Sequence, residues 1–431
     1  MSYLHPPKKR ELAAWTELIP ESEIRRLLSF KVSYYFGGGK PGALPTGIFS
    51  MILEELSQRY RRPPDGPKSA LTDLNYGPTG GELWFRQTLA TRLREQDKLD
   101  FLDAKEGWQD VIITNGSQQC LYALLDSIIN PGDIILTARP AYLGFLVPVV
   151  KLGGEIVTIR TDLDGIIPEC VESAIRACQR ELHKTPELIY VVADSDNPKG
   201  TTLPEKRRKQ LFDLAEEFNI LILEDAAYRE IQFQEKVPPI KKLDTENERV
   251  CYLRTTSKEA AVLRVGYSVL PPEIREEVIK DKGYLDLCTS TLIQRILDIY
   301  YREYIDQALS ETIAVYKKRR DAMCTAIDEF FPDSGVRTDP HGGFFAWWES
   351  DNTDFDATVF LEQVAIPNDI LYVPGRAFYP LKGRAFHMTT DKLGENIVHL
   401  NSMRLGYSWS DPEDIFTGIH NLGKLLTKEL E

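Results

Sequence analysis

Short apolar runs alternate with helical stretches over the central half of the chain. Strand-like runs occur as DVIITN, DIILTA, GEIVTI, ELIYVV, NILILED, VCYLRTT and RVGYSVL between residues 110 and 270. Helical stretches, such as the one through LFDLAEEF, separate several of these runs. The runs are apolar throughout rather than alternating, which is typical of strands covered on both faces. The pattern therefore predicts an α/β domain with a mainly parallel sheet.

The pattern changes after about residue 290. A long amphipathic helix is predicted over residues 292–331, followed by a smaller α+β region with GGFFAWW, DILYVPG and HLNSMRLGYS. Before the sheet region come a helix-like stretch, PESEIRRLLSF, and a loop dense in glycine and proline at residues 36–49. Such a loop lets the backbone approach a ligand closely. We expect a large domain over residues 55–305 and a small domain formed by residues 1–54 with residues 306–431.

Composition narrows the class of protein. The 431 residues are 42% hydrophobic, which suffices for a large core. A net charge of -13 argues against nucleic acid or an anionic membrane as the main partner. The six cysteines form no C-x-x-C pair, which argues against a metal site and favours free thiols. We find no signal-peptide pattern and no apolar run of the roughly 20 residues that a membrane span needs, so a cytoplasmic protein is expected.

Polar residues follow the predicted strands, where ligands of open α/β sheets bind. Gly116-Ser117-Gln118 opens a helix, which suits a phosphate, although Ser117 could equally cap its own helix. Asn197 lies in the turn NPKG. Asp225 ends NILILED, with Tyr228 three residues later. A buried carboxylate there could pair with a protonated ring nitrogen; an N-cap aspartate beside a packed tyrosine is the alternative.

A lysine occupies the next loop. Lys258 follows the hydroxyl-bearing residues Thr255 and Ser257, and Arg264 comes after it. A lysine in this place could form a Schiff base, whereas most lysines are solvated surface charges. The ordered series is phosphate site, N-P-x-G, D-x-x-Y and S-K with a downstream arginine, each after its own strand, and chance assembly of that series is improbable.

The chain resembles the fold-type I pyridoxal-phosphate aminotransferases of class I and II, in the branch with the kynurenine/α-aminoadipate aminotransferases. The resemblance covers nearly the whole chain and rests on FGGGKP, LNYGPTGGELWFRQTLA, TNGSQQCLYAL, INPGDIILTARPAYLGFL, DNPKG, EDAAY, TTSK, GGFFAW, YVPGRAFYP and NSMRLGYS. It implies a three-layer fold with a mainly parallel sheet, a smaller α+β domain and pyridoxal 5'-phosphate as cofactor. It also implies ping-pong transfer of an amino group from an amino acid, aromatic or 2-aminoadipate or similar, to a 2-oxo acid such as 2-oxoglutarate.

The resemblance also implies roles for the residues around the cofactor. Lys258 would carry the cofactor as a Schiff base and shuttle the substrate proton, and Asp225 would keep the pyridine nitrogen protonated. Tyr228 and Asn197 would hydrogen-bond the phenolic oxygen of the ring, and Tyr142 would stack on the ring face. The phosphate would be held by Ser117, Gln118, Thr255, Ser257 and Arg264.

Further implied roles concern the substrate and a second subunit. Arg404 in NSMRLGYS would pair bidentately with the substrate carboxylate, with Asn197 beside it, although a surface ion pair is the alternative. Gly38 and Gly39 match the N-terminal loop that closes over the substrate. Tyr76 in LNYGPTGG matches a tyrosine that reaches the phosphate of the neighbouring subunit's cofactor. A homodimer with shared active sites is therefore expected.

The sequence departs from the family pattern in two places. Five residues without glycine, EAAVL, separate Lys258 from Arg264, where relatives commonly have six with Pro-Gly or Ser-Gly. Lys199 replaces the usual threonine of N-P-T-G. Two other functions stay open: a pyridoxal-phosphate C-S β-lyase, which uses nearly the same residues, and a non-catalytic ligand sensor. The sequence does not choose between aromatic, 2-aminoadipate and branched-chain amino donors.

Overall fold

One large sheet organises the central part of the chain. The computed structural model describes residues 11–19, 26–27, 29–63, 66, 72–103 and 105–431, and the predicted helix-like stretch PESEIRRLLSF lies largely outside them. The sheet has ten strands in the order β15-β14-β4-β3-β6-β7-β8-β9-β2, with β5 beside β4. The strands are β2 (Val111–Thr114), β3 (Ile134–Arg139), β4 (Glu155–Asp162), β5 (Gly165–Ile166), β6 (Leu188–Val191), β7 (Leu221–Asp225), β8 (Val250–Thr255), β9 (Gly266–Val269), β14 (Arg384–His387) and β15 (Lys392–Glu395).

The central strands run in one direction, as their continuous apolar sequences predict. Strands β4, β3, β6, β7 and β8 pair in parallel, whereas β9 and β2 complete one edge in antiparallel pairs. All seven predicted strands are present. Because parallel strands share one carboxyl edge, the loops after β6, β7 and β8 emerge side by side.

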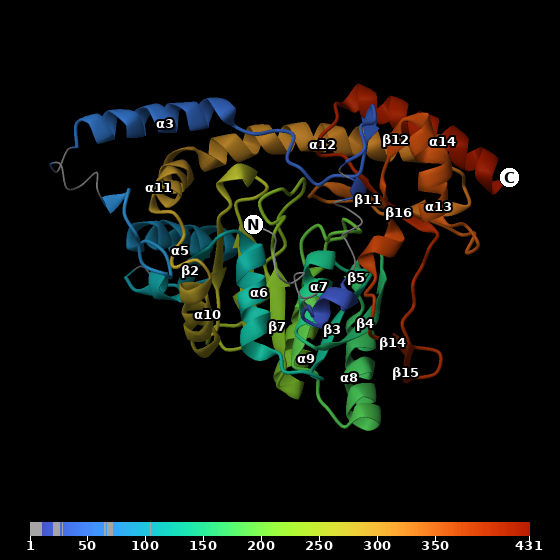
Figure 1. The fold of residues 1–431 in the computed structure, drawn as a ribbon, viewed down its shortest axis with the longest axis horizontal. Coiled ribbons are helices and arrows are strands. Elements are labelled where there is room, and N and C mark those ends of the chain that lie inside the picture. Colours follow the sequence, from blue (N-terminus) through green and yellow to red (C-terminus); the bar gives the residue numbers. More distant parts are fainter. Residues whose placement is uncertain (1–10, 20–25, 28, 64–65, 67–71, 104) are drawn as a thin grey trace, which may run out of the picture.

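Helices cover both faces of this sheet (Figure 1). Successive residues of β3 point to opposite faces: Ile134 and Leu136 pack with α8 and α9, while Ile135 packs with α6 and α7. These layers confirm the predicted three-layer α/β fold. The helices around the sheet are α5 (Leu83–Asp97), α6 (Ser117–Ile128), α7 (Leu143–Lys151), α8 (Pro168–Leu182), α9 (Glu205–Phe218) and α10 (Pro272–Leu285).

A smaller α+β unit lies beside the large sheet, at the upper right of Figure 1. Its four-stranded sheet has the order β10-β11-β16-β13 and packs with helices α12 and α14 around a separate hydrophobic core. Strand β1 pairs in parallel with β12, so residues near the N-terminus join the C-terminal part of the chain. The elements are β1 (Tyr34–Tyr35), α12 (Ile305–Phe330), β10 (Gly335–Arg337), β11 (Phe345–Ser350), α13 (Ala357–Phe360), β12 (Ile370–Leu371), β13 (Val373–Pro374), β16 (Ser402–Gly406) and α14 (Pro412–Leu430).

A hairpin from the C-terminal part of the chain pairs with the large sheet. Strand β14 pairs in parallel with β4 and antiparallel with β15, so residues 384–395 extend the large sheet. The hairpin lies between β13 and β16 in the sequence, and both of those strands belong to the small sheet. The predicted division into a large and a small domain stays a prediction, and the structure shows only that this hairpin pairs with the large sheet.

The long helix predicted over residues 292–331 is interrupted. It consists of α11 (Thr291–Ile299), a π-helical turn at Tyr300–Tyr304 and α12. Tyr300 stacks on Phe49, with ring centroids 5.0 Å apart, and the Tyr301 hydroxyl donates to Glu259 Oε2 at 2.9 Å. The two consecutive tyrosines of this turn thus contact different segments of the chain, and a π-helical turn inside a longer helix is uncommon.

Two further α-helices belong to the N-terminal part of the described chain. They are α1 (Trp15–Leu18) and α3 (Thr46–Arg61), and α3 lies near α11 and the π-helical turn. Within the described ranges, each helix is too short or too polar to cross a membrane.

Candidate active site

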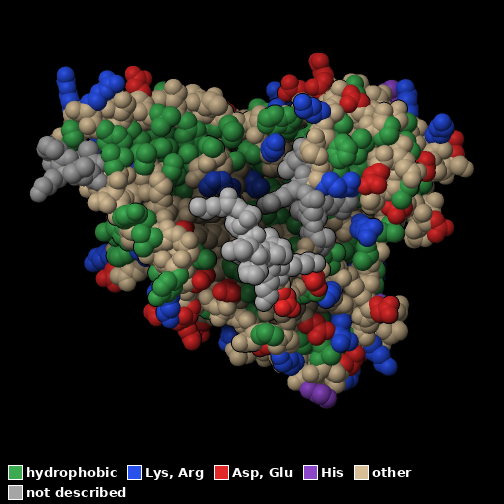
Figure 2. All heavy atoms as spheres, in the orientation of Figure 1, with side chains coloured by type: hydrophobic (Ala, Val, Ile, Leu, Met, Phe, Trp, Pro, Cys, Tyr) green, Lys and Arg blue, Asp and Glu red, His purple; other side chains and the backbone are tan. Residues whose placement is uncertain are grey.

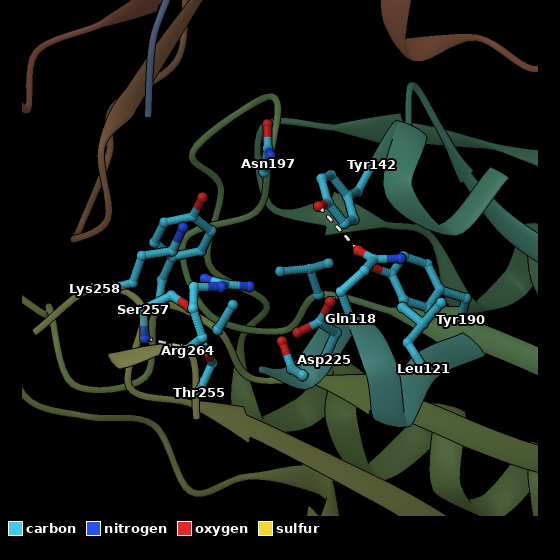
Figure 3. A pocket seen from close by; sticks show the side chains of 14 residues that line it. Gln118, Leu121, Tyr142, Tyr190, Asn197, Asp225, Thr255, Ser257, Lys258 and Arg264 are labelled. Carbon is cyan, nitrogen blue, oxygen red and sulfur yellow. Dashed lines mark hydrogen bonds between the residues drawn. The ribbon is translucent and has the colours of Figure 1, made fainter. Parts of the chain in front are cut away.

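A cavity of about 180 Å³ opens at the carboxyl ends of β6, β7 and β8, beside the N-terminus of α6 (Figure 3). It brings together ten of the side chains that the sequence singled out, from five separate stretches of chain. These are Ser117, Gln118, Tyr142, Asn197, Asp225, Tyr228, Thr255, Ser257, Lys258 and Arg264, and the remaining lining residues are Leu121, Tyr190, Val192 and Ala227. The sheet topology alone accounts for this meeting, because each of these stretches follows a strand or begins a helix at one edge.

One end of the cavity is built to hold an anion. No side chain caps the N-terminus of α6, and Gly116 precedes it at φ +76°. Arg264 Nη1 donates to Ser257 Oγ at 2.9 Å, and Thr255 Oγ1 lies at 2.9 Å from the same oxygen. A Cβ at Gly116 would lie 2.7 Å from Arg264 Nη2, so a side chain there would displace the guanidinium as well as strain the backbone. A helix N-terminus, hydroxyls and an arginine together suit a phosphate.

The short Lys258–Arg264 connection does not prevent this arrangement. Arg264 adopts a left-handed backbone conformation at φ +53°, directly after the 3-10 turn Ala261–Leu263. This conformation is uncommon for residues other than glycine and reverses the chain sharply. The arginine thereby reaches Ser257, although five residues rather than six precede it.

Gln118 and Tyr142 form one wall of the cavity. The Tyr142 hydroxyl donates to Gln118 Oε1 at 3.2 Å, and Gln118 Nε2 donates to the Gly144 carbonyl at 2.7 Å. A Cβ at Gly144 would lie 2.4 Å from the Tyr142 ring, so glycine makes room for this ring position. The aromatic face is thus fixed in the cavity, where a planar ligand can stack against it.

A buried carboxylate lies at the floor of the cavity. Asp225 Oδ2 accepts a hydrogen bond from the Tyr190 hydroxyl at 2.9 Å, whereas Asp225 Oδ1 is buried and has no hydrogen-bond partner among the described residues. Burial raises the pKa of Asp225, while the Tyr190 hydrogen bond and the positive charge of Lys258 oppose that rise. A buried, unpartnered carboxylate oxygen is costly, and a cationic or N–H ligand group would satisfy it.

Lys258 extends into the cavity between aromatic rings. Its Nζ lies 4.7 Å from the Tyr228 ring centroid and 5.6 Å from the Phe344 centroid. Burial lowers the pKa of Lys258 to about 8, with smaller contributions in the same direction from Arg404 and Arg264, while Asp225 opposes the shift. A substantial fraction of the amine is therefore neutral near pH 7 to 8, as a nucleophile or proton acceptor requires.

A second arginine lies beside the cavity, and the part of the chain that the structure describes gives it no acidic partner. Arg404, on β16, is 2% exposed; Nη1 donates to Asn197 Oδ1 and Nη2 to the Gly37 carbonyl, both at 2.8 Å. Its Nε has no partner in the described part of the chain, and burial lowers its pKa to about 10. The rings of Phe345 and Phe378 lie 4.0 and 4.8 Å from the guanidinium carbon. Arg404 is not in a surface ion pair; it is a buried cation available to an anion.

The other predicted site residues lie at different distances from the cavity. Gly38 and Gly39 follow the carbonyl that Arg404 contacts, and a Cβ on Gly39 would lie 2.6 Å from the Phe345 ring. The N-terminal loop thus packs closely beside Arg404. Tyr76 does not line the cavity, and it is 80% exposed. Its predicted contact with the cofactor phosphate of a neighbouring subunit stays a prediction.

Sequence reasoning missed several residues of the site. Tyr190 contacts Asp225 directly, and Phe345 and Phe378 flank Arg404. The sequence carries one signal for Tyr190, which is a hydroxyl within the otherwise apolar strand sequence LIYVV. Such a group must find a buried partner, and the neighbouring strand ends in a carboxylate. The two phenylalanines lie in strand-like and loop sequence that resembles ordinary core.

The geometry fits pyridoxal phosphate part by part. The anion site around Arg264 and Ser257 suits the phosphate of the cofactor. The unpartnered Asp225 Oδ1 suits a protonated ring nitrogen, and the amine of Lys258 suits the aldehyde. An α/β sheet with these groups along its carboxyl edge defines the fold-type I class of pyridoxal-phosphate enzymes.

Comparison with known proteins identifies the family within this class. Residues 61–395 match the family model described as aminotransferase class I and II. The chain therefore belongs to the aminotransferase class I and II family, and it is a pyridoxal-phosphate-dependent aminotransferase. It is 33% identical over 418 residues to aromatic-amino-acid aminotransferase 1 of Thermococcus litoralis, covering 95% of this chain and 92% of that protein.

Two further relatives lie in the predicted branch. Mouse mitochondrial kynurenine/alpha-aminoadipate aminotransferase is 28% identical over 372 residues, 83% of each chain. The crystal structure of Pyrococcus horikoshii kynurenine aminotransferase superposes with a TM-score of 0.85 at 31% identity, covering 97% of this chain and 98% of that one. The predicted resemblance to this branch is confirmed.

Proposed function

We propose that this aminotransferase moves the amino group of an aromatic amino acid or of 2-aminoadipate to 2-oxoglutarate in a ping-pong reaction. The observation that carries the proposal is Arg404, a buried arginine whose guanidinium contacts an amide and a carbonyl but, among the described residues, no carboxylate. Amino acids and 2-oxo acids share the carboxylate that this cation would bind in both half-reactions. Phe345 and Phe378 beside Arg404, and the names of the relatives, favour large donors.

The proposed chemistry assigns a task to each group in the cavity. Bound pyridoxal phosphate supplies an aldehyde that takes up the amino group and a ring that withdraws electrons from the reacting bond. Lys258 would hold the cofactor through its aldehyde and would move the proton of the substrate α-carbon. Asp225 balances the charge of the protonated ring nitrogen. Tyr228 and Asn197 direct their polar groups to the ring oxygen, and Tyr142 covers the ring face.

The phosphate and substrate subsites are assigned in the same way. The groups proposed for the phosphate are Ser117, Gln118, Thr255, Ser257 and Arg264, with Tyr76 contributed by a second subunit. Arg404 and Asn197 would orient the substrate carboxylate, and the loop with Gly38 and Gly39 would exclude water from it. If the chain divides into the large and small domains expected from the sequence, the residues that hold the cofactor belong to the large domain. Arg404 then belongs to the small domain.

A homodimer is part of the proposal. Tyr76 is 80% exposed, and exposed apolar side chains gather over α3 and α11 on one face of the molecule (Figure 2). Met51 and Leu53 of α3 are half-exposed, and Val262, in the Lys258–Arg264 loop, is 84% exposed. An apolar surface of this kind beside the active-site loop fits a second copy of the chain. A cytoplasmic location is also proposed, because all six cysteines are free.

The substrate proposal is tested by titrating the holoenzyme with single amino acids and following its visible absorption. We expect phenylalanine, tyrosine, kynurenine or 2-aminoadipate to convert the bound cofactor to its amino form, and 2-oxoglutarate to restore the original spectrum. Branched-chain donors serve as the matched comparison. Preferential conversion by branched-chain donors would refute the donor class, and release of pyruvate and ammonia from a cysteine conjugate without reversal would indicate a β-lyase.

The shared site is tested by mixing two variants, Lys258→Ala and Tyr76→Phe. Each variant is expected to be impaired alone, but a mixed dimer has one site with both Lys258 and a partner tyrosine. Because that site draws Lys258 from one subunit and Tyr76 from the other, mixing after mild denaturation should restore up to about one quarter of wild-type activity by random pairing. Activity that never exceeds the mean of the two separate variants would show that Tyr76 does not act across subunits.

A further inference from the structure

The two oxygens of the Asp225 carboxylate have different surroundings. Oδ2 accepts a hydrogen bond from Tyr190 on the neighbouring strand, at 2.9 Å. Oδ1 is buried, and the described residues give it no partner. One oxygen is thus occupied by a protein donor, and the other is kept for a ligand at the cavity floor. Tyr190 and Asp225 both line this cavity (Figure 3).

The position of the Tyr190 hydroxyl is fixed by packing. The Tyr190 ring is 2% exposed and stacks on Phe145 with centroids 3.8 Å apart and planes 5° from parallel. Phe145 belongs to α7, the helix that begins directly after Tyr142. A ring held between a helix and the sheet cannot swing its hydroxyl away without losing this contact. The hydrogen bond to Asp225 is therefore present before any ligand binds.

We propose that Tyr190 is a positioning residue for the cofactor: it orients Asp225 with Oδ1 toward the ring nitrogen and keeps the carboxylate ionised. The proposal rests on the role proposed above for Asp225. A hydroxyl that donates to a carboxylate favours the charged form, and a charged partner is what a protonated pyridine nitrogen needs.

The charges around Asp225 show why this contribution matters. Burial raises the pKa of Asp225, and the opposing contributions come from the Tyr190 hydrogen bond, the charge of Lys258 and the Ala227 N–H. When Lys258 is bonded to the cofactor, its charge is no longer that of a free ammonium. The Tyr190 hydrogen bond then remains as the side-chain contribution from the protein that favours ionised Asp225, beside the protonated ring nitrogen itself. Without it, the pKa of Asp225 rises, so the carboxyl is neutral up to a higher pH.

Other titratable groups near Asp225 do not account for such a change. They are Cys120 on α6, Tyr142 before α7, Asp196 after β6, Tyr228 after β7 and Lys258 after β8. Burial raises the pKa of Cys120 and of Tyr142 to about 12, and that of Tyr228 is raised too, so all three stay protonated below about pH 8.5. Burial raises the pKa of Asp196 to about 7 and lowers that of Lys258 to about 8, and both groups titrate in this range in the wild type as well. The charge of Asp225 contributes to both pKa values, so any change in them between wild type and variant follows from the change at Asp225.

The test is the dissociation constant of pyridoxal phosphate, measured by absorbance from about pH 5.5 to about pH 8.5, for Tyr190→Phe. Tyr252→Phe is the matched control, because the buried Tyr252 hydroxyl donates to Asp97 Oδ2 at 2.9 Å and neither residue lines the cavity. We expect Tyr190→Phe to bind the cofactor about tenfold more weakly at the acidic end and with nearly wild-type affinity at the alkaline end. Tyr252→Phe should follow wild type throughout.

Each other outcome has a distinct meaning. Equal weakening at every pH, or none, overturns the proposal for Tyr190. If Tyr190→Phe is not recovered folded, Phe145→Leu replaces it, because this variant keeps the phenol of Tyr190 but removes its stacking partner. We expect a smaller loss of cofactor affinity with the same pH dependence. Unchanged affinity would refute the role proposed for Tyr190. Asp225→Asn separates the two levels of inference, because unchanged cofactor affinity in that variant would refute the role proposed for Asp225 itself.

Discussion

Replacing Lys258 with alanine is expected to lower kcat for transamination at least about 1,000-fold, because the proton acceptor for the substrate α-carbon is removed. The pKa of Lys258, lowered to about 8 by burial, makes this amine a far better acceptor near neutral pH than an ordinary lysine. The KM for the amino donor should change much less, since Arg404 is untouched. Steady-state kinetics with a saturating 2-oxo acid measure both constants.

Two controls distinguish this role from a general effect of losing a lysine. Lys199→Ala removes another lysine near the site, two residues after Asn197. The Nζ of Lys199 contacts Thr161 Oγ1 and the Asp162 carbonyl, both at 3.3 Å. This variant should lower kcat less than about tenfold. Adding methylamine or ethylamine to Lys258→Ala should restore part of the rate, because a small amine fits the space left by the side chain. A Lys258→Ala enzyme with near wild-type kcat would refute the assignment.

Much of the fold and site was predictable because both depend on local patterns in the sequence. Continuous apolar runs mark strands buried on both faces, and the residues that follow them must meet at one edge of a parallel sheet. Asn197, Asp225 and Lys258 follow successive neighbouring strands, so strand order alone brings them together. Their chemistry, an amide, a carboxylate and an amine, was then enough to suggest a cofactor.

The remaining features depend on contacts between segments distant in the sequence. The hydroxyl in ELIYVV indicates a buried partner for Tyr190, but the run does not indicate that its ring stacks on Phe145 and is thereby held toward Asp225. The tyrosines of the π-helical turn at residues 300–304 contact Phe49 and Glu259, which lie in other parts of the chain. The β14–β15 hairpin joins the large sheet through pairing with β4, although its sequence neighbours belong to the small sheet. Such pairings are set by tertiary packing rather than local preference.

Arg264 shows how a departure from a family pattern can leave the geometry intact. With five residues in EAAVL, Arg264 still contacts Ser257, and it does so from a left-handed backbone conformation. A sequence comparison counts the residues between two positions, but it does not give the backbone angles that those residues adopt.

Arg404→Lys is expected to lower kcat/KM for amino donors about 100-fold, a loss near 2.7 kcal/mol, mainly through a higher KM. Lysine keeps the positive charge but offers no planar fork, so it cannot hold Asn197 and both carboxylate oxygens together as Arg404 can. The same loss should be seen for the 2-oxo acid, because one carboxylate subsite serves both half-reactions. Measuring kcat/KM for each substrate with the other held fixed tests this equality.

The matched control lies on the same small sheet. Arg337 on β10 forms a bidentate pair with Asp328, with both N–O distances at 2.6 Å, so Arg337→Lys removes an equivalent fork away from the cavity. It should leave both kcat/KM values within about threefold of wild type, since exposed ion pairs contribute little. If Arg404→Lys impaired only one of the two substrates, the carboxylates would bind at separate subsites, and a single arginine could not serve the ping-pong reaction proposed here.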